Sequence, residues 1–126
     1  MKARELMLYD WVRIKKGMCA GCLNQLTEVH ELECASNYEP IPITEEILEA
    51  NGFVCRGHAG YQRLKDELCD RHLTFYINGM MFADGMPYED NDCNVLHNIK
   101  YVHELQRALR CCNLWDIANN FKIEYQ

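Results

Sequence analysis

The sequence has no long apolar run, no secretion signal and no excess of positive charge. Its uncharged stretch at residues 73–83 is among the longest and ends at Asp84, whereas a helix that crosses a bilayer needs about 20 apolar residues. Glu5 and Asp10 interrupt the apolar region that a signal peptide needs. The formal net charge is -6, and an acidic chain repels phosphate backbones. We therefore expect a cytoplasmic protein without a membrane anchor or a nucleic-acid partner.

Fingerprints of catalysis and cofactor binding are also missing from the chain. The glycines do not match either nucleotide-binding fingerprint. Residues 103–107 nearly spell the zinc-protease motif HExxH, but Arg107 occupies the second histidine position and cannot ligate zinc. Cysteines and histidines are frequent, yet the sequence singles out no nucleophile and base. We assign no catalytic residue and no cofactor, and we keep a small hydrolase or redox enzyme as the third hypothesis.

The composition is that of one ordinary globular domain. The chain has 126 residues, of which 48% are hydrophobic and 25% are charged. This length lies within the common range for a single domain with its own core. No repeat, linker or low-complexity tract divides it, so we expect residues 1–126 to form one domain.

The N-terminal third contains one clear strand and one ambiguous segment. In residues 10–14 apolar and polar side chains alternate, which is typical of a strand. The basic group Arg13, Lys15 and Lys16 is interpreted as a solvated strand edge. Residues 23–34 carry apolar side chains at a spacing of three, but they lack strong helix start signals, so strands are favoured. Residues 61–69 fit either a helix or a strand.

A short helix is predicted over residues 44–51. Thr44 is a good N-cap, and the two glutamates after it suit the positive end of the helix dipole. Asn51 and Gly52 supply a left-handed stop. The next apolar pair, at residues 53–54, is expected to start a strand.

The C-terminal half carries a hairpin signal and a longer helix. Asn78-Gly79 between apolar runs predicts a two-residue type I′ turn, followed by an exposed loop at residues 84–94. Asn98 can cap a helix over residues 99–112, and a spacing of three and four relates its apolar positions 102, 105, 109 and 112. A further turn at residues 114–119 and a closing strand at residues 121–125 complete the chain. Strands at both ends with helices between them predict an α+β fold with a mainly antiparallel sheet.

Eight cysteines are many for a chain of this length. Without a secretion signal they should stay reduced, and we expect them to behave as small buried hydrophobic residues. Two pairs with the spacing CxxH suggest an alternative, a zinc-stabilised domain, because thiolate and imidazole are preferred zinc ligands; its four ligands would be Cys55, His58, Cys69 and His72. Cys19 and Cys22 form a CxxC pair, but the sequence gives no helix after it, as a thioredoxin-like site needs.

Four segments resemble a family of small uncharacterised proteins of gut anaerobes, their phages and mobile elements. They are KAREL (residues 2–6), DWV (10–12), YEPIPITEEILEANGF (38–53) and IKYVHELQ (99–106). The resemblance implies SH3-like barrel character at the N-terminus and strands at both residues 23–34 and 61–69. It implies no established activity, and the cysteine pairs are not part of its pattern.

The function expected from these observations is non-enzymatic. The chain resembles an accessory or interaction module of phage or mobile-element type, with another protein as its partner. The zinc-stabilised domain is the alternative hypothesis.

Overall fold

The structure is a computed structural model that describes residues 6–64, 66–67, 72–83 and 98–123. The loop expected at residues 84–94 lies outside this range, as do residues 124–125 of the expected closing strand. The strands are β1 (Trp11–Ile14), β2 (Leu23–Gln25), β3 (Tyr38–Glu39), β4 (Val54–Cys55), β5 (Tyr61–Arg63), β6 (Leu73–Tyr76) and β7 (Met80–Ala83). The helices are α1 (Val29–Leu32), α2 (Glu45–Ala50), α4 (Val102–Cys111) and α5 (Trp115–Asn119), with 3-10 turns η2 (Ala35–Asn37) and η3 (Gly57–Ala59).

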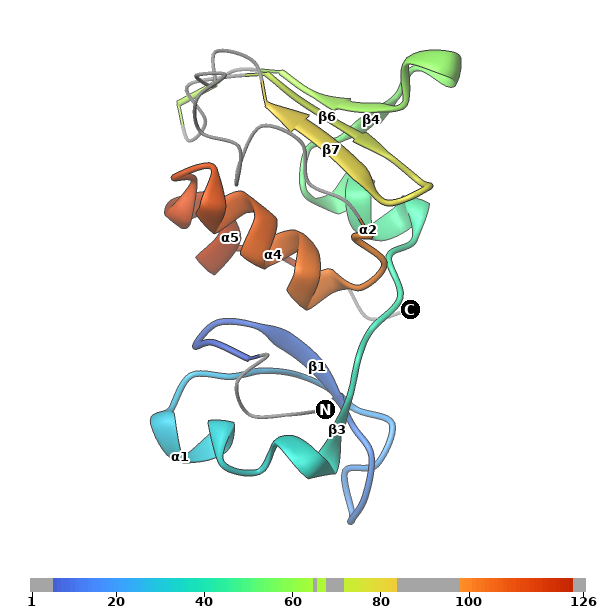
Figure 1. Cartoon of the computed structure of the whole chain (residues 1–126). Helices are drawn as coiled ribbons and strands as arrows, with labels where there is room; N and C mark the ends of the chain where they lie inside the picture. The colour runs from blue at the N-terminus through green and yellow to red at the C-terminus, as the bar shows by residue number, and fades with distance from the viewer. Residues whose placement is uncertain (1–5, 65, 68–71, 84–97, 124–126) are drawn as a thin grey trace.

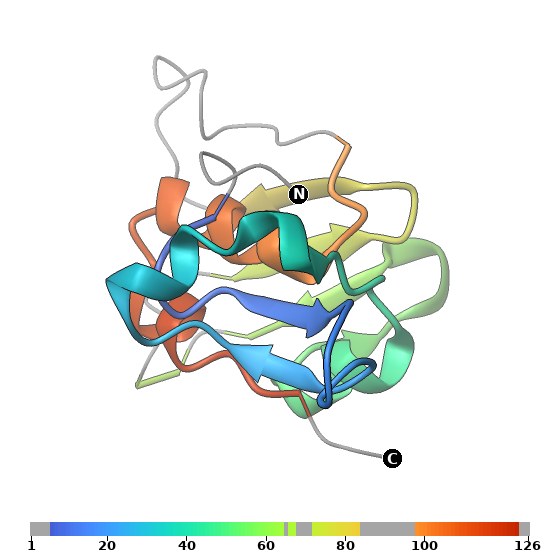
Figure 2. The ribbon, with the colours of Figure 1, turned by 90° about the horizontal axis from the view of Figure 1, so that it is seen from below.

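The elements form layers, with α4 and α5 between two antiparallel sheets (Figure 1). One sheet has the strand order β4-β5-β6-β7 and the other has the order β2-β1-β3. The short helix α1 and the turn η2 lie on the outer side of the three-stranded sheet, as the view from below also shows (Figure 2). The predicted α+β class with antiparallel sheets is therefore confirmed.

The N-terminal sheet does not close into the SH3-like barrel that the resemblance implied. Its strands have two to four residues, and among the described residues β2 and β3 are its outer strands. A barrel needs strands long enough to tilt and pair around the full circle. Instead, both faces of this small sheet are covered by other elements, so it packs as an open layer.

Residues 23–34 divide into a strand and a helix, so the prediction of strands is wrong for their second half. The helix α1 begins after Glu28 with a capping box in which Glu31 accepts hydrogen bonds from the backbone. Glu31 also accepts from the backbone N–H of Thr27 and the side chain of Asn24. Burial alone would raise the pKa of Glu31, but these hydrogen bonds outweigh it and the pKa lies below its ordinary value.

The second ambiguous segment begins as a strand. Residues 61–63 form β5, which pairs with both β4 and β6. The strand ends at Arg63, and residues 65, 68 and 69 lie outside the described part of the chain. The prediction of a strand is thus confirmed for the first three residues of this segment.

The predicted helix at residues 44–51 is confirmed, and its C-terminal residue has a further role. The Thr44 side chain accepts from the Ile47 N–H, and Gly52 has a φ of +87°. The Asn51 amide donates to the Lys122 carbonyl and accepts from the Lys122 N–H, both within 2.8 Å. This side chain takes the place of a neighbouring strand, so residues 121–123 run along it without the predicted strand pairing.

The hairpin at Asn78-Gly79 forms, but with a different turn from the one predicted. Tyr76 pairs with Met80, so the loop has three residues and Ile77 belongs to it. Gly79 has a φ of +100°, whereas Asn78 is not in the left-handed region. A three-residue loop with a left-handed glycine is the next common hairpin after the two-residue type. The Gly79 carbonyl also accepts from the Ile99 N–H, which ties the turn to the chain before α4.

The last long helix begins at Val102, three residues later than predicted. Pro42 and Tyr101 form an isolated β-bridge, and this pairing keeps residues 99–101 extended. Glu104 caps the helix by accepting from the N–H groups of Lys100 and Tyr101, so Asn98 is not the N-cap.

Among the described residues no helix is long and apolar enough to cross a membrane.

Two faces of α4 are buried. The predicted apolar stripe lies in the main core with the four-stranded sheet and α2. A second stripe, made of His103, Gln106 and Arg110, is also buried and begins the contact with the three-stranded sheet. Because the side chains of this second stripe are polar and buried, they need hydrogen-bonding partners. These partners form an interior polar site between α4 and the three-stranded sheet.

Candidate functional site

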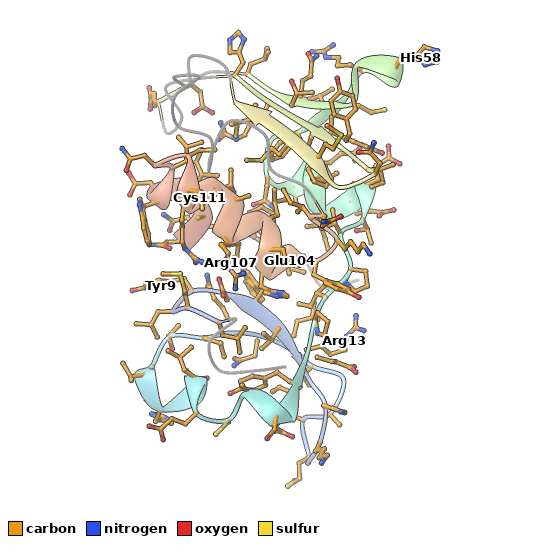
Figure 3. All side chains as sticks on the ribbon, in the orientation of Figure 1. Tyr9, Arg13, His58, Glu104, Arg107 and Cys111 are labelled. Carbon is orange, nitrogen blue, oxygen red and sulfur yellow. The ribbon has the colours of Figure 1, made fainter. Side chains whose placement is uncertain are left out.

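The residues of the zinc hypothesis do not converge in the described part of the chain. Cys55 lies in β4, His58 in η3 and His72 just before β6, and all three are exposed. Figure 3 shows His58 at the far end of the molecule from Arg13. Cys69 lies outside the described residues. Where the structure describes the chain, no three His, Cys, Asp or Glu side chains come close enough to hold a metal.

The cysteines correct the expectation that they act as small buried hydrophobic residues. Of the six that the structure describes, Cys112 alone is buried, and the other five are exposed thiols. Cys111 is one of these five, whereas its neighbour Cys112 packs in the main core as its helix position predicts. Packing therefore explains one described cysteine and leaves the rest without a structural role in the core.

The near-HExxH segment at residues 103–107 serves the fold. Glu104 caps α4 with its carboxylate, as described above, and this use occupies the oxygen that accepts both N–H groups. His103 is buried and stacks on Tyr101 with ring centroids 6.2 Å apart. Arg107 is exposed on the same helix (Figure 3). Neither the metal nor the base role of that motif is available here.

A pocket of about 360 Å³ opens between the three-stranded sheet and α2. Its walls come from four separate parts of the chain: the sheet, the β3–α2 connection, α2 and the C-terminal segment. Most of the walls are aliphatic, and three side chains are polar. The lining residues are Arg13, Leu23, Ile41, Pro42, Thr44, Glu46, Ile47 and Ile123.

Arg13 is the cation of this pocket, and its position corrects the interpretation of a solvated strand edge. It lies on β1, the central strand of its sheet, opposite Leu23 and Glu39. Its side chain is half-buried and shares the face of β1 with Trp11, toward α4 and the C-terminal segment. Lys15 and Lys16 follow in the exposed loop. The three basic residues therefore separate into one pocket residue and two solvated ones.

A second polar site is a seam of buried side chains between α4 and the beginning of β1. The Gln106 amide donates to the carbonyls of Tyr9, at 2.6 Å, and Ala118, at 2.9 Å, and accepts from the Trp11 N–H at 2.9 Å. All its hydrogen-bonding groups are used, as a buried amide requires. The Trp11 indole N–H donates to the Phe121 carbonyl at 2.7 Å. The seam therefore holds β1 to α4 and α5 by directed bonds.

An ion pair forms the other half of this seam. Arg110 and Asp10 are nearly fully buried, and their closest N–O distance is 2.7 Å. Asp10 also accepts from the Met7 N–H, and Arg110 donates to the Leu8 carbonyl. The guanidinium lies over the ring of Trp115, 5.8 Å from its centroid. This pair fixes the position of the beginning of β1 relative to α4, because neither charge can stay buried without the other.

The turn before β1 contains a strained residue. Tyr9 has a φ of +71°, a conformation that costs a bulky residue roughly 1–2 kcal/mol. Its side chain is 42% exposed, so little core packing compensates, and its carbonyl is held by Gln25 and Gln106. Figure 3 shows Tyr9 at this end of the three-stranded sheet. The strain is thus maintained by the seam.

Sequence reasoning missed both the pocket and the seam. A weak signal exists for the seam: His103, Gln106 and Arg110 repeat at a spacing of three and four, beside the apolar stripe. Such a repeat of polar residues usually indicates a solvated face. The pocket has no signal in the sequence, because its lining residues span positions 13 to 123.

Comparisons with known proteins identify no relative from which a role could be transferred. No family model, no curated protein and no solved structure matches this chain. The resemblance to small proteins of gut anaerobes stays a prediction. The functional argument therefore rests on the pocket, the seam and the exposed thiols themselves.

Proposed function

We propose that this protein is a non-enzymatic interaction module that binds another protein through its pocket. An aliphatic side chain of the partner fills the pocket, and an adjacent carboxylate of the partner pairs with Arg13. The observation that carries the proposal is the half-buried Arg13 beside a largely aliphatic cavity of about 360 Å³. This volume is at the lower end of the range of roughly 300–1,000 Å³ for ligand pockets, so an anchoring side chain of the partner can enter it.

The polar groups of the pocket support binding more than catalysis. Arginine stays protonated at all ordinary pH values and so cannot act as a base. The Thr44 hydroxyl already accepts the Ile47 N–H as the helix cap, although its proton can still be donated to a ligand. The remaining polar side chain, Glu46, is exposed on α2. Among the described lining residues, no hydrogen bond joins the Thr44 hydroxyl to the Glu46 carboxylate, as a nucleophile and its base would need.

Charge favours a different protein over a second copy of the chain. Each copy has a net charge of -6, and like charges disfavour association. An acidic group of a partner would be attracted by the Arg13 guanidinium in the pocket and repelled by the Glu46 carboxylate. A charge-assisted hydrogen bond to Arg13 is worth about 1.5–3 kcal/mol. The pocket therefore selects an aliphatic residue next to an acidic one.

The biological setting belongs to the same proposal. Exposed thiols suit a reducing compartment, which supports the cytoplasm. The resemblance supports an accessory protein of a phage or mobile element.

Selection from a library of displayed random peptides tests the proposal. Peptides selected on the wild-type protein should share an aliphatic residue beside Asp or Glu. Their affinity should fall about tenfold or more in Arg13→Gln, because the lost hydrogen bond is worth about 1.5–3 kcal/mol and roughly 1.4 kcal/mol corresponds to a factor of ten. The affinity should rise in Glu46→Gln, since this change removes the anion at the rim.

Lys16→Gln is the matched control, because it removes the same charge from the exposed loop outside the pocket. It should bind the selected peptides like the wild type. Thermal melts of all three variants exclude unfolding as the cause of a lower affinity. Selected peptides without an acidic residue, or equal losses in Arg13→Gln and Lys16→Gln, would refute the proposal.

A further inference from the structure

The β1–β2 loop brings two exposed cysteines together in one turn. The Cys22 N–H donates to the Cys19 carbonyl at 2.9 Å, and Gly21 between them has a φ of +89°. This is the pattern of a type II β-turn, in which the first and fourth Cα atoms lie within about 7 Å. Cys19 and Cys22 occupy those two positions, and both thiols are exposed.

The base of this loop is fixed by the backbone, although its tip is exposed. The Ile14 N–H donates to the Cys22 carbonyl at 2.8 Å, and the Gly21 N–H donates to the Ile14 carbonyl at 2.7 Å. A second turn precedes the first, because the Ala20 N–H donates to the Gly17 carbonyl. Four backbone hydrogen bonds therefore hold the main chain of the two cysteines in place before any ligand arrives.

We propose that Cys19 and Cys22 form a two-thiolate site for a soft monovalent metal ion, Cu(I). Thiolates and thioethers are preferred ligands of Cu(I), and Cu(I) is stable with two sulfur ligands in a line. Zinc needs four ligands, and in the described residues no third Cys, His, Asp or Glu joins this pair. The coordination that the turn offers therefore suits the ion with the lower coordination number.

Three neighbours of the pair fit the same ligand. Met18 has a relative exposure of 106%, so its thioether lies in water within the same loop. Burial gives no reason for an apolar side chain at this position. Lys15 and Lys16 are also exposed beside the turn, and their charge favours the anion that two thiolates form with one Cu(I).

The site is independent of the proposed pocket, and a titration with Cu(I) tests it. Reduced protein is titrated without oxygen, in competition with bicinchoninate, whose Cu(I) complex is coloured. The wild type should bind one Cu(I) per chain more than Cys19→Ser/Cys22→Ser does. Each single variant should lose the same ion as the double variant, because the two thiolates act together.

Cys34→Ser/Cys111→Ser is the matched control, since it removes two exposed thiols that no turn joins. It should keep the ion that the first double variant loses. Equal copper uptake by the two double variants would overturn the proposal. So would a single variant, Cys19→Ser or Cys22→Ser, that still takes up the ion with the affinity of the wild type.

Discussion

The two sheets are attached to α4 by different kinds of interaction. The four-stranded sheet contributes to a large apolar core with one face of α4, α2 and α5. The three-stranded sheet has a separate small cluster on its outer face, made of Leu6, Val12, Leu26, Ala35 and Tyr38. It meets α4 through the buried Gln106 and the Asp10–Arg110 pair, in addition to Trp11 and Leu23, which pack against the large core.

This difference teaches how a small sheet can be fixed without a large core of its own. Apolar contacts are strong but not directional, so they would let a short sheet slide on a helix. Hydrogen bonds and a buried ion pair allow fewer arrangements, since a displaced sheet would leave polar groups without partners. The seam thus fixes the position of β1, and with it the position of Arg13 in the pocket.

The largest expected effect comes from breaking the ion pair. Arg110→Met should destabilise the protein by about 3–5 kcal/mol, because it leaves the Asp10 carboxylate buried without its cation. Urea unfolding measures the change. The double variant Asp10→Asn/Arg110→Met should recover part of the loss, because Asp10→Asn removes the negative charge that Arg110→Met leaves buried.

Arg107→Met is the control for this prediction. Arg107 is exposed one turn earlier on α4, so the substitution should change the unfolding free energy by less than about 0.5 kcal/mol. If Arg110→Met and Arg107→Met unfold at the same urea concentration, the seam does not fix the sheet.

The next prediction compares the two apolar clusters through a fully buried leucine in each. Leu105→Ala in the large core should cost about 2–5 kcal/mol, and Leu26→Ala should fall toward the lower end of that range. The smaller cluster has fewer neighbours around the cavity and can relax around it. Urea unfolding of both variants measures the difference.

Hydrogen exchange sharpens the same comparison. Leu26→Ala should speed exchange in β1, β2 and β3 and leave β5 and β6 protected, since the outer cluster includes no residue of the four-stranded sheet. Leu105→Ala should speed exchange in both sheets. Faster exchange of β5 and β6 in Leu26→Ala would show that the two regions open as one unit.

The smallest expected effect concerns the strained Tyr9. Tyr9→Asn should stabilise the protein by up to about 1 kcal/mol, because asparagine tolerates a positive φ better than tyrosine does. The backbone hydrogen bonds of residue 9 remain. Tyr9→Val should destabilise it, because β-branched residues are genuine outliers in this region. Equal melting temperatures for the two variants would show that the seam does not hold residue 9 in this conformation.

Local signals predicted the elements that depend on local interactions. Thr44 caps α2, Gly52 ends it and the apolar stripe of α4 is buried, as the sequence predicts. The hairpin was located correctly, although its turn is one residue longer. These features depend on interactions between residues that are close in the sequence, so the sequence alone is enough to predict them.

Three of the errors share one cause, which is a partner that lies far away in the sequence. In residues 121–123, the described part of the predicted closing strand, the Asn51 amide pairs with Lys122 in place of a neighbouring strand. The start of α4 is delayed because Tyr101 bridges to Pro42. Arg13 lies in a central strand because β2 and β3 come to both sides of β1. Periodicity within a segment contains none of this information.

By itself, the sequence determined the class of the fold, the capped helix α2, the hairpin of β6 and β7, and the apolar face of α4. Only the tertiary structure decided which polar side chains are buried in the seam, where the pocket lies and which cysteines are exposed. The physical reason is range. Caps, turns and stripes are set by neighbours along the chain, whereas the Gln106 amide and the Arg13 pocket exist only after residues about one hundred positions apart have met.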